Sequence, residues 1–80
     1  MPTTEQAYTP AAAEFAVFSI ENTARRLNVT GDVVYKALSD TDGIRRFLFP
    51  SYPALHTQSK EYIVDEVLSY LKSKNSQIVK

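Results

Sequence analysis

The chain has 80 residues, of which 44% are hydrophobic and 11% are aromatic, and its nine basic and nine acidic side chains cancel. A chain of this size forms one domain at most, and its apolar content argues against disorder throughout. The absence of cysteine excludes disulfides and thiolate metal sites, and the balanced charge disfavours a non-specific nucleic-acid binder, whose affinity depends on a basic excess.

Targeting and membrane signals are also missing from the sequence, so we expect a cytoplasmic protein without a membrane-spanning helix. The first nine residues contain Glu5 and no Lys or Arg, unlike the basic start of a secretory signal. The longest uninterrupted apolar run, Phe15 to Phe18, has four residues, whereas a membrane-spanning helix needs about 20. The lack of cysteine fits a reducing compartment.

The first predicted helix runs from Pro10 to about Asn28 and follows a polar, flexible arm at residues 1–9. Thr9 is a favourable N-cap, and Pro10 suits the first helical position, where no N–H is needed. Apolar residues recur at alternating steps of four and three, which predicts one narrow stripe on the helix. The stripe comprises Ala13, Val17, Ile20, Ala24 and Leu27.

Two further aromatic residues, Phe15 and Phe18, fall on nearly the opposite side of this helix. The helix is therefore either central to the fold, or it offers one apolar face to a partner or to a second copy in a homodimer. We favour the central position, because two Phe rings exposed together are unusual in a monomer.

A second helix is predicted after Thr30, its N-cap, and ends near Asp40, while Asp32 favours the positive end of the helix dipole. The residues expected on the buried face are Val33, Val34, Ala37 and Leu38. The residues expected to point away from it are Asp32, Tyr35, Lys36 and Ser39.

A short third helix is predicted from Gly43 to about Phe49, capped by Asp42. Its buried residues are expected to be Ile44, Phe47 and Leu48, with Arg45 and Arg46 turned outward. Pro50 should end the helix, so residues 49–53 are predicted to form a kinked, aromatic loop.

The fourth helix should begin with Thr57 or a neighbour as its cap and run to about Lys74, followed by a frayed tail at residues 75–80. Its apolar arc comprises Ile63, Val64, Val67, Leu68, Tyr70 and Leu71. Glu61, Asp65 and Glu66 lie outside this arc, and we interpret them as a solvated face, because ligands from one helix rarely surround a cation.

No segment shows the alternation of a strand bounded by turn signals. The sequence therefore predicts a single all-α domain at residues 10–74, a compact bundle of about four helices whose third helix is short.

The middle of the chain, from Ala24 to Leu38, has the pattern of a helix-turn-helix, with a small residue, a tight turn and a capped second helix. In a DNA-binding protein, Tyr35, Lys36 and Ser39 would meet a groove. The side chains available for phosphates would be Arg25, Arg26, Arg45 and Arg46. The acidic Asp32 on the same exposed face weakens this hypothesis, so DNA binding is the alternative function.

His56 is the only histidine in the sequence, and no nucleophile–base pair or set of metal ligands surrounds it. We expect it to hydrogen-bond loop backbone beside the fourth helix, with a partner contact as the second possibility. Neither an enzymatic activity nor a bound cofactor or metal is expected.

Several short blocks of sequence resemble the small bacterial proteins of the domain-of-unknown-function family 3791. The sharpest blocks are Leu55-His56-Thr57-Gln58 and Lys60-Glu61-Tyr62-Ile63, and softer ones are Glu14-Phe15, Ile20-Glu21-Asn22 and Val34-Tyr35. The resemblance implies a helical fold, a bacterial cytosolic setting and no defined catalytic residues. In their gene surroundings, members of this family are similar to the small partner of a toxin-like ADP-ribosyltransferase, which implies an antitoxin or an adaptor whose partner is encoded by a neighbouring gene.

We therefore expect a non-catalytic protein–protein interaction module of antitoxin-like or adaptor type. Surplus aromatic residues and balanced charge favour this role, because aromatic side chains are enriched in interfaces. The resemblance makes His56, Thr57 and Gln58 either a junction of the fold or a partner contact. The candidate partner-binding residues are Tyr35, Lys36, Arg45, Arg46, Tyr52, His56, Gln58 and Tyr62.

Overall fold

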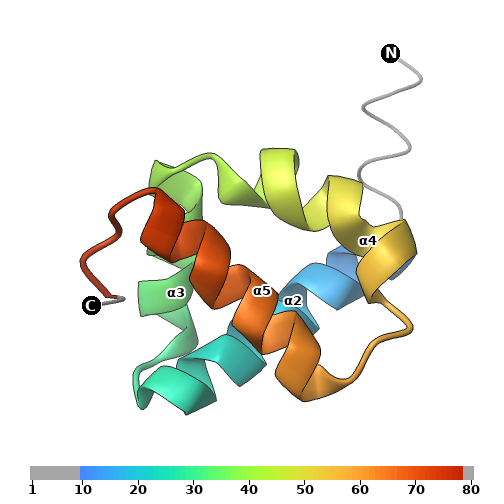
Figure 1. Ribbon diagram of the computed structural model, residues 1–80, viewed down its shortest axis with the longest axis horizontal. Coiled ribbons are helices and arrows are strands. Elements are labelled where there is room, and N and C mark those ends of the chain that lie inside the picture. Colours follow the sequence, from blue (N-terminus) through green and yellow to red (C-terminus); the bar gives the residue numbers. More distant parts are fainter. Residues whose placement is uncertain (1–9, 79–80) are drawn as a thin grey trace.

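The computed structural model describes residues 10–78, which form four α-helices and one π-helical segment and contain no strand (Figure 1). In chain order the elements are α2 (Pro10–Leu27), α3 (Gly31–Asp40), η1 (Ile44–Leu48), α4 (Phe49–Leu55) and α5 (Lys60–Ser73). The predicted all-α bundle is confirmed. The expected arm at residues 1–9 and the last two residues of the expected tail lie outside the described residues.

Helix α2 is the centre of the bundle, because it packs against α3, η1, α4 and α5. Figure 1 shows α5 in front of α2, with α3 and α4 toward opposite ends of the molecule. The largest fully buried apolar side chains come from the other elements: Val34, Leu38, Leu48, Val67 and Leu71. Each such side chain stabilises the fold by about 1.5–3 kcal/mol relative to an exposed one, so these contacts hold the bundle together.

The stripe predicted on α2 is wrong in its first half. Ala13 is exposed and Val17 is 59% exposed, whereas Phe15 is only 6% exposed. The buried residues of α2 are Ala12, Phe15, Ala16, Ser19, Thr23 and Ala24. Most of them are small, and small side chains let neighbouring helices approach closely. The face of α2 with small residues is therefore buried, and the more apolar face that contains Val17 stays exposed, because the neighbouring helices pack closely around α2.

The connection between α2 and α3 is a tight turn of three residues, 28–30. Asn28 has a φ of 59°, its N–H donates to the Arg25 carbonyl (3.2 Å), and the Val29 N–H donates to the Ala24 carbonyl (3.0 Å). These two bonds form a Schellman motif, which satisfies the last carbonyls of a helix. Thr30 occupies the N-cap position of α3 as predicted, but its hydroxyl accepts no capping hydrogen bond.

The buried face of α3 agrees with the prediction at Val34, Ala37 and Leu38. Val33, which was expected on the same face, is instead 38% exposed. Its position lies at the edge of the arc that Val34, Ala37 and Leu38 share, so burying those three leaves Val33 turned partly toward solvent.

The aromatic loop predicted at residues 49–53 is wrong, because this segment is helical and belongs to α4. The Phe49 N–H donates to the carbonyl of Ile44, five residues back, so η1 is wider than an α-helix and runs directly into α4. In a regular α-helix the ring of Pro50 would press on the Arg46 carbonyl. The wider turn relieves that contact, so the chain passes Pro50 as the second residue of α4 without leaving the helical conformation.

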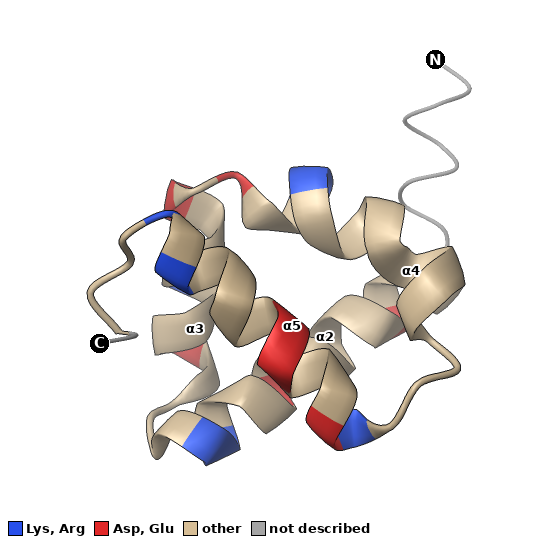
Figure 2. Ribbon diagram, viewed as in Figure 1, with Lys and Arg blue, Asp and Glu red and all other residues tan. Residues whose placement is uncertain are grey.

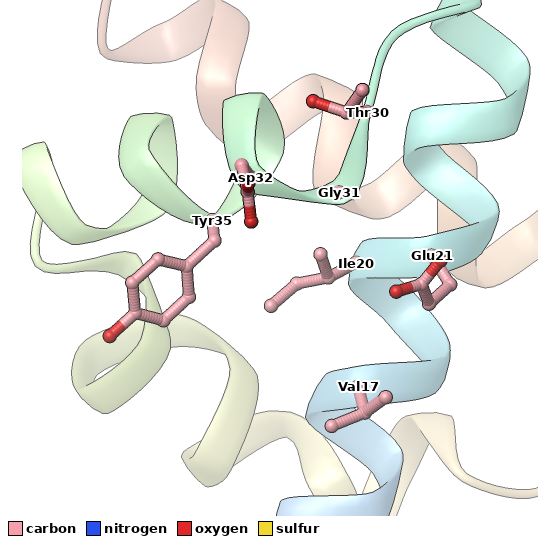
Figure 3. Close-up of a pocket in the computed structure, with 7 residues that line it drawn as sticks. All are labelled: Val17, Ile20, Glu21, Thr30, Gly31, Asp32 and Tyr35. Atoms are coloured by element: carbon pink, nitrogen blue, oxygen red, sulfur yellow. The ribbon is translucent and has the colours of Figure 1, made fainter.

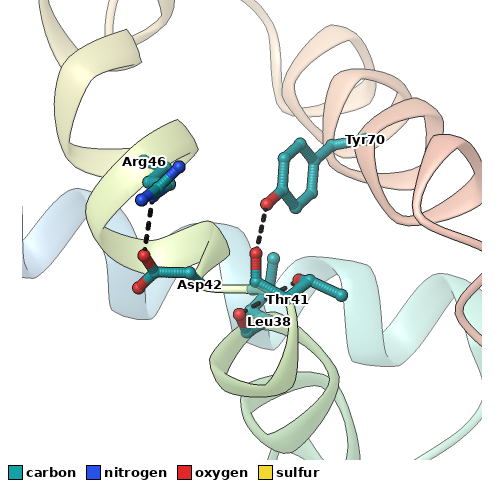
Figure 4. A network of polar contacts seen from close by, with 5 residues as sticks. All are labelled: Leu38, Thr41, Asp42, Arg46 and Tyr70. Carbon is teal, nitrogen blue, oxygen red and sulfur yellow. Dashed lines mark hydrogen bonds and ion pairs between the residues drawn. The ribbon is translucent and has the colours of Figure 1, made fainter.

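The junction between α3 and η1 is fastened to α5 by Tyr70 (Figure 4). The Tyr70 hydroxyl donates to the Thr41 carbonyl (2.7 Å), and its ring stacks on Phe47 with centroids 4.8 Å apart. Asp42 does not cap the short helix as predicted; its Oδ2 accepts a hydrogen bond from Arg46 Nε at 2.8 Å. The junction therefore has a defined conformation, held from two sides.

Helix α5 begins at a capped N-terminus, where Ser59 Oγ accepts from the Tyr62 N–H at 3.1 Å. Its apolar arc is confirmed, with Ile63, Val64, Val67 and Leu71 buried and the remaining two members half-buried. Beyond α5 the chain turns, and Ile78 packs partly buried against the core. None of the helices in the described part of the chain combines the length and apolar character needed to cross a bilayer.

Candidate functional site

Exposed apolar side chains gather where α2 meets the start of α3. Val17 and Phe18 of α2 are 59% and 43% exposed, and Tyr35 of α3 is 55% exposed. They line two adjoining hollows of about 330 and 380 Å³, which share Val17. We name the combined area the α2–α3 surface. It comprises Ala13, Glu14, Val17, Phe18, Ile20, Glu21, Thr30, Gly31, Asp32 and Tyr35.

The first hollow is an open groove between α2 and the start of α3, and both apolar and polar residues line it (Figure 3). Val17 and Ile20 lie along α2, and the Ile20 side chain points toward the ring of Tyr35 on the other side of the groove. At the end of the groove α3 begins with Gly31, and a Cβ built there would lie 3.2 Å from Glu21 Oε2. The glycine therefore lets the Glu21 carboxylate lie against the positive end of the α3 dipole.

All of the charged side chains that line the two hollows are acidic. Glu14 and Glu21 project from α2, and Asp32 lies in the first turn of α3. None of the three carboxylates forms an ion pair with a residue in the range 10–78. The α2–α3 surface thus combines exposed apolar side chains with a negative rim that forms no ion pair with residues 10–78.

Among the predicted partner-binding residues, Tyr35 lies in the α2–α3 surface, and Tyr52 and His56 form a second group at the end of α4. The Tyr52 ring meets Phe15 edge-on at 5.6 Å and stacks on His56 at 4.4 Å. His56 is exposed, and none of the side-chain hydrogen bonds among residues 10–78 involves its imidazole. The expected bond to loop backbone is therefore wrong, because the ring stacks on Tyr52 instead.

The remaining candidates are exposed and spread over three other places in the fold. Lys36 forms an ion pair with Asp40 (3.7 Å), and Arg46 pairs with Asp42, while Arg45 is exposed beside it on η1. Gln58 lies in the connection between α4 and α5, and Tyr62 lies in the first turn of α5. Figure 2 shows basic residues on η1 and at the end of α2 on opposite sides of the molecule, so they form no continuous basic stripe.

Sequence reasoning missed most of the α2–α3 surface. Val17 was assigned to the buried stripe, and neither Glu14 nor Glu21 was among the candidate partner contacts, whereas Phe18 was considered only as part of a face shared with Phe15. The available signal was the second apolar face of the first helix, which allowed one of the two faces to stay open, although we favoured a central helix with both faces covered. It did not say which face, because the small residues that pack inside α2 carry little hydrophobic weight.

No group of three or more His, Asp or Glu side chains within residues 10–78 is arranged to hold a metal ion. A search of curated proteins and a search of solved structures each found no match. One family model matches residues 14–74, and its description is "Protein of unknown function (DUF3791)". Since the match covers most of the chain and includes all of α3, η1, α4 and α5, this protein belongs to the DUF3791 family.

Proposed function

We propose that this protein is a non-catalytic protein–protein interaction module that binds its partner through the α2–α3 surface. The observation that carries the proposal is the exposure of Val17, Phe18 and Tyr35 around two adjoining hollows. Contiguous apolar side chains rimmed by polar ones are typical of interaction sites, and aromatic residues are enriched in interface cores.

The partner we propose is a toxin-type protein, with a toxin-like ADP-ribosyltransferase as the specific candidate. The family resemblance supports this choice, and a small, neutral chain suits an antitoxin or adaptor in a bacterial cytoplasm. Such a chain acts by covering a surface of the toxin, which requires an exposed apolar patch and no catalytic group of its own.

A DNA-binding regulator is the second candidate, and the three-residue turn between α2 and α3 favours it. The charges of α3 favour the protein partner instead. Asp32 lies in its first turn, where a recognition helix meets base edges, and Lys36 is paired with Asp40. Arg26 is paired with Asp65 of α5 at 3.1 Å, so it is less available for a phosphate.

The proposed function is tested by co-expressing the full chain with the product of the adjacent gene and purifying through a tag on that product. We expect the wild-type chain to co-purify and Tyr35→Ala to reduce its recovery. His56→Ala is the informative comparison, because His56 is also an exposed aromatic candidate but lies at the end of α4. Equal recovery of the wild type, Tyr35→Ala and His56→Ala would contradict binding through the α2–α3 surface. Recovery of none of these proteins would contradict the proposed partner.

The DNA alternative is tested by titrating the protein with its own promoter duplex at low salt. A regulator should bind in a salt-sensitive way and lose affinity when Arg45 and Arg46 are replaced by Ala, since phosphate contacts release counterions. We expect no detectable binding.

A further inference from the structure

We propose that the α2–α3 surface takes a basic amphipathic helix from the partner, with an apolar stripe flanked by Lys or Arg. The inference rests on the proposed function and specifies the chemistry of the partner. It follows from two properties of the surface, the sign of its charges and their spacing along α2.

The sign of the charges selects a cationic occupant. Glu14, Glu21 and Asp32 border the hollows, and no Lys, Arg or His lines them. Because the three carboxylates have no ion-pair partner in the described structure, an arriving cation need not displace an existing one. Complementary charges also steer the encounter and discriminate against wrong partners.

The spacing of the charges selects a helix. Glu14 and Glu21 are seven residues apart on α2, which places them about 10.5 Å apart along the helix axis. Val17 and Phe18 lie between them and are exposed. A partner helix with cations seven residues apart, and apolar residues three and four positions after the first, matches this pattern. Helices that bind grooves use anchors at such positions.

The same charges disfavour two other occupants of an apolar surface. A second copy of this chain would bring its own Glu14 and Glu21 to the interface, and like charges placed across an interface weaken it. An anionic membrane would be repelled in the same way. The homodimer through the Phe18 face is therefore not the occupant we propose.

The probes for the experiment are two synthetic helical peptides with the same apolar stripe. One carries Lys at the two flanking positions, seven residues apart, and the other carries Glu at both. The full-length ¹⁵N-labelled protein is titrated with each peptide, and amide shifts report both the affinity and the location of binding. We expect the Lys peptide to bind at least tenfold more tightly, with the largest shifts on α2 and the start of α3, and to weaken as salt rises.

Two double variants separate a local contact from a general charge effect. Glu14→Gln with Glu21→Gln removes two charges from the α2–α3 surface, and Glu61→Gln with Glu66→Gln removes two from α5. Both change the net charge equally. We expect the first pair of changes to lower the affinity for the Lys peptide by about three- to tenfold. The second pair should change that affinity by less than twofold.

Phe18→Ser and Tyr62→Ser form the matched apolar pair, since both rings are exposed but only Phe18 lines the hollows. Loss of binding for Phe18→Ser alone supports the proposal. Equal binding of the two peptides, shifts centred away from α2, or equal effects of the two charge pairs would overturn it. A dimer of the free protein in sedimentation that Phe18→Ser converts to a monomer would also overturn it.

The experiments distinguish an error in the basic helical partner from an error in the proposed function. If Tyr35→Ala reduces co-purification of the adjacent gene product but the Glu14, Glu21 pair of changes has no more effect than the α5 pair, the interaction module stands. In that case only the basic character of its partner is wrong.

Discussion

Asn28 is the residue at which the turn between α2 and α3 stores backbone strain. Its φ of 59° lies in the left-handed region, which L side chains adopt at a cost and glycine adopts freely. We predict that Asn28→Gly raises the free energy of unfolding by roughly 0.5 kcal/mol, whereas Asn28→Ala lowers it by about 1 kcal/mol. Urea unfolding followed by circular dichroism measures both changes.

The control is the same exchange inside the helix. Asn22 lies in the middle of α2, where its side chain donates to the Phe18 carbonyl at 2.8 Å. Asn22→Gly should lower stability, because glycine is a poor helix former. A decrease at both positions would show that the left-handed turn is absent in solution.

Gly43 is required for a different reason, which is space. Its φ is −74°, an ordinary helical value, but a Cβ there would lie 2.7 Å from Tyr70 Cε2 and 2.8 Å from Leu38 Cδ2. Leu38 is fully buried and cannot move aside. We predict that Gly43→Ala lowers the free energy of unfolding by about 1–3 kcal/mol, the usual cost of overpacking, as measured by urea unfolding.

Gly31→Ala is the matched variant for Gly43→Ala. The nearest obstacle to a Cβ at Gly31 is the end of the exposed Glu21 side chain, which can rotate away. Moving Glu21 loses part of its contact with the α3 dipole, whereas alanine is the better helix former, so the two effects oppose each other and the free energy of unfolding should change by less than about 1 kcal/mol. Equal losses for the two variants would contradict the close approach of Tyr70 to Gly43.

At the scale of the elements, local capping decides where α5 begins. Ser59 Oγ accepts from the Tyr62 N–H, so among the expected caps, Thr57 or a neighbour, it is the neighbour that fills this role. We predict that Ser59→Ala lowers the free energy of unfolding by about 1 kcal/mol and that Thr57→Ala has little effect. Thermal unfolding of the two variants checks the assignment, and a larger loss for Thr57→Ala would refute it.

The π-helical segment η1 shows how a helix can continue past a proline. Pro50 predicts the end of a helix when each turn is assumed to be regular. Here the widened turn before it lets the chain continue as α4, so that Phe49 and Leu55 are buried in the core. A local rule about proline therefore fails where a change of helix type is stabilised by tertiary packing.

At the scale of the whole molecule, the orientation of α2 determines which aromatic side chain holds the core and which one faces outward. Phe15 is 6% exposed and covered by Tyr52, whereas Phe18 is 43% exposed. We predict that Phe15→Ala lowers the free energy of unfolding by about 3–5 kcal/mol and that Phe18→Ala changes it by less than about 1 kcal/mol. Denaturant titration of the two variants measures the contrast, and the reverse order would mean that α2 is rotated.

The sequence by itself determined the all-α class and the extents of α2, α3 and α5 closely. These features depend on the periodicity of apolar residues and on the residues at helix ends, such as Pro10 at the start of α2 and Asn28 just after its end. Short-range steric and hydrogen-bonding rules are enough to predict them.

Only the tertiary structure decided which face of α2 is buried, how the chain passes Pro50, and where the candidate site lies. Glu21 and Val17 on α2 meet Asp32 and Tyr35 on α3 because two helices pack at a short turn, and no local pattern specifies that contact. In a small bundle, several helices must pack against one another at the same time. A face of small residues can therefore be buried in preference to a more apolar face, because it lets the neighbouring helices approach closely.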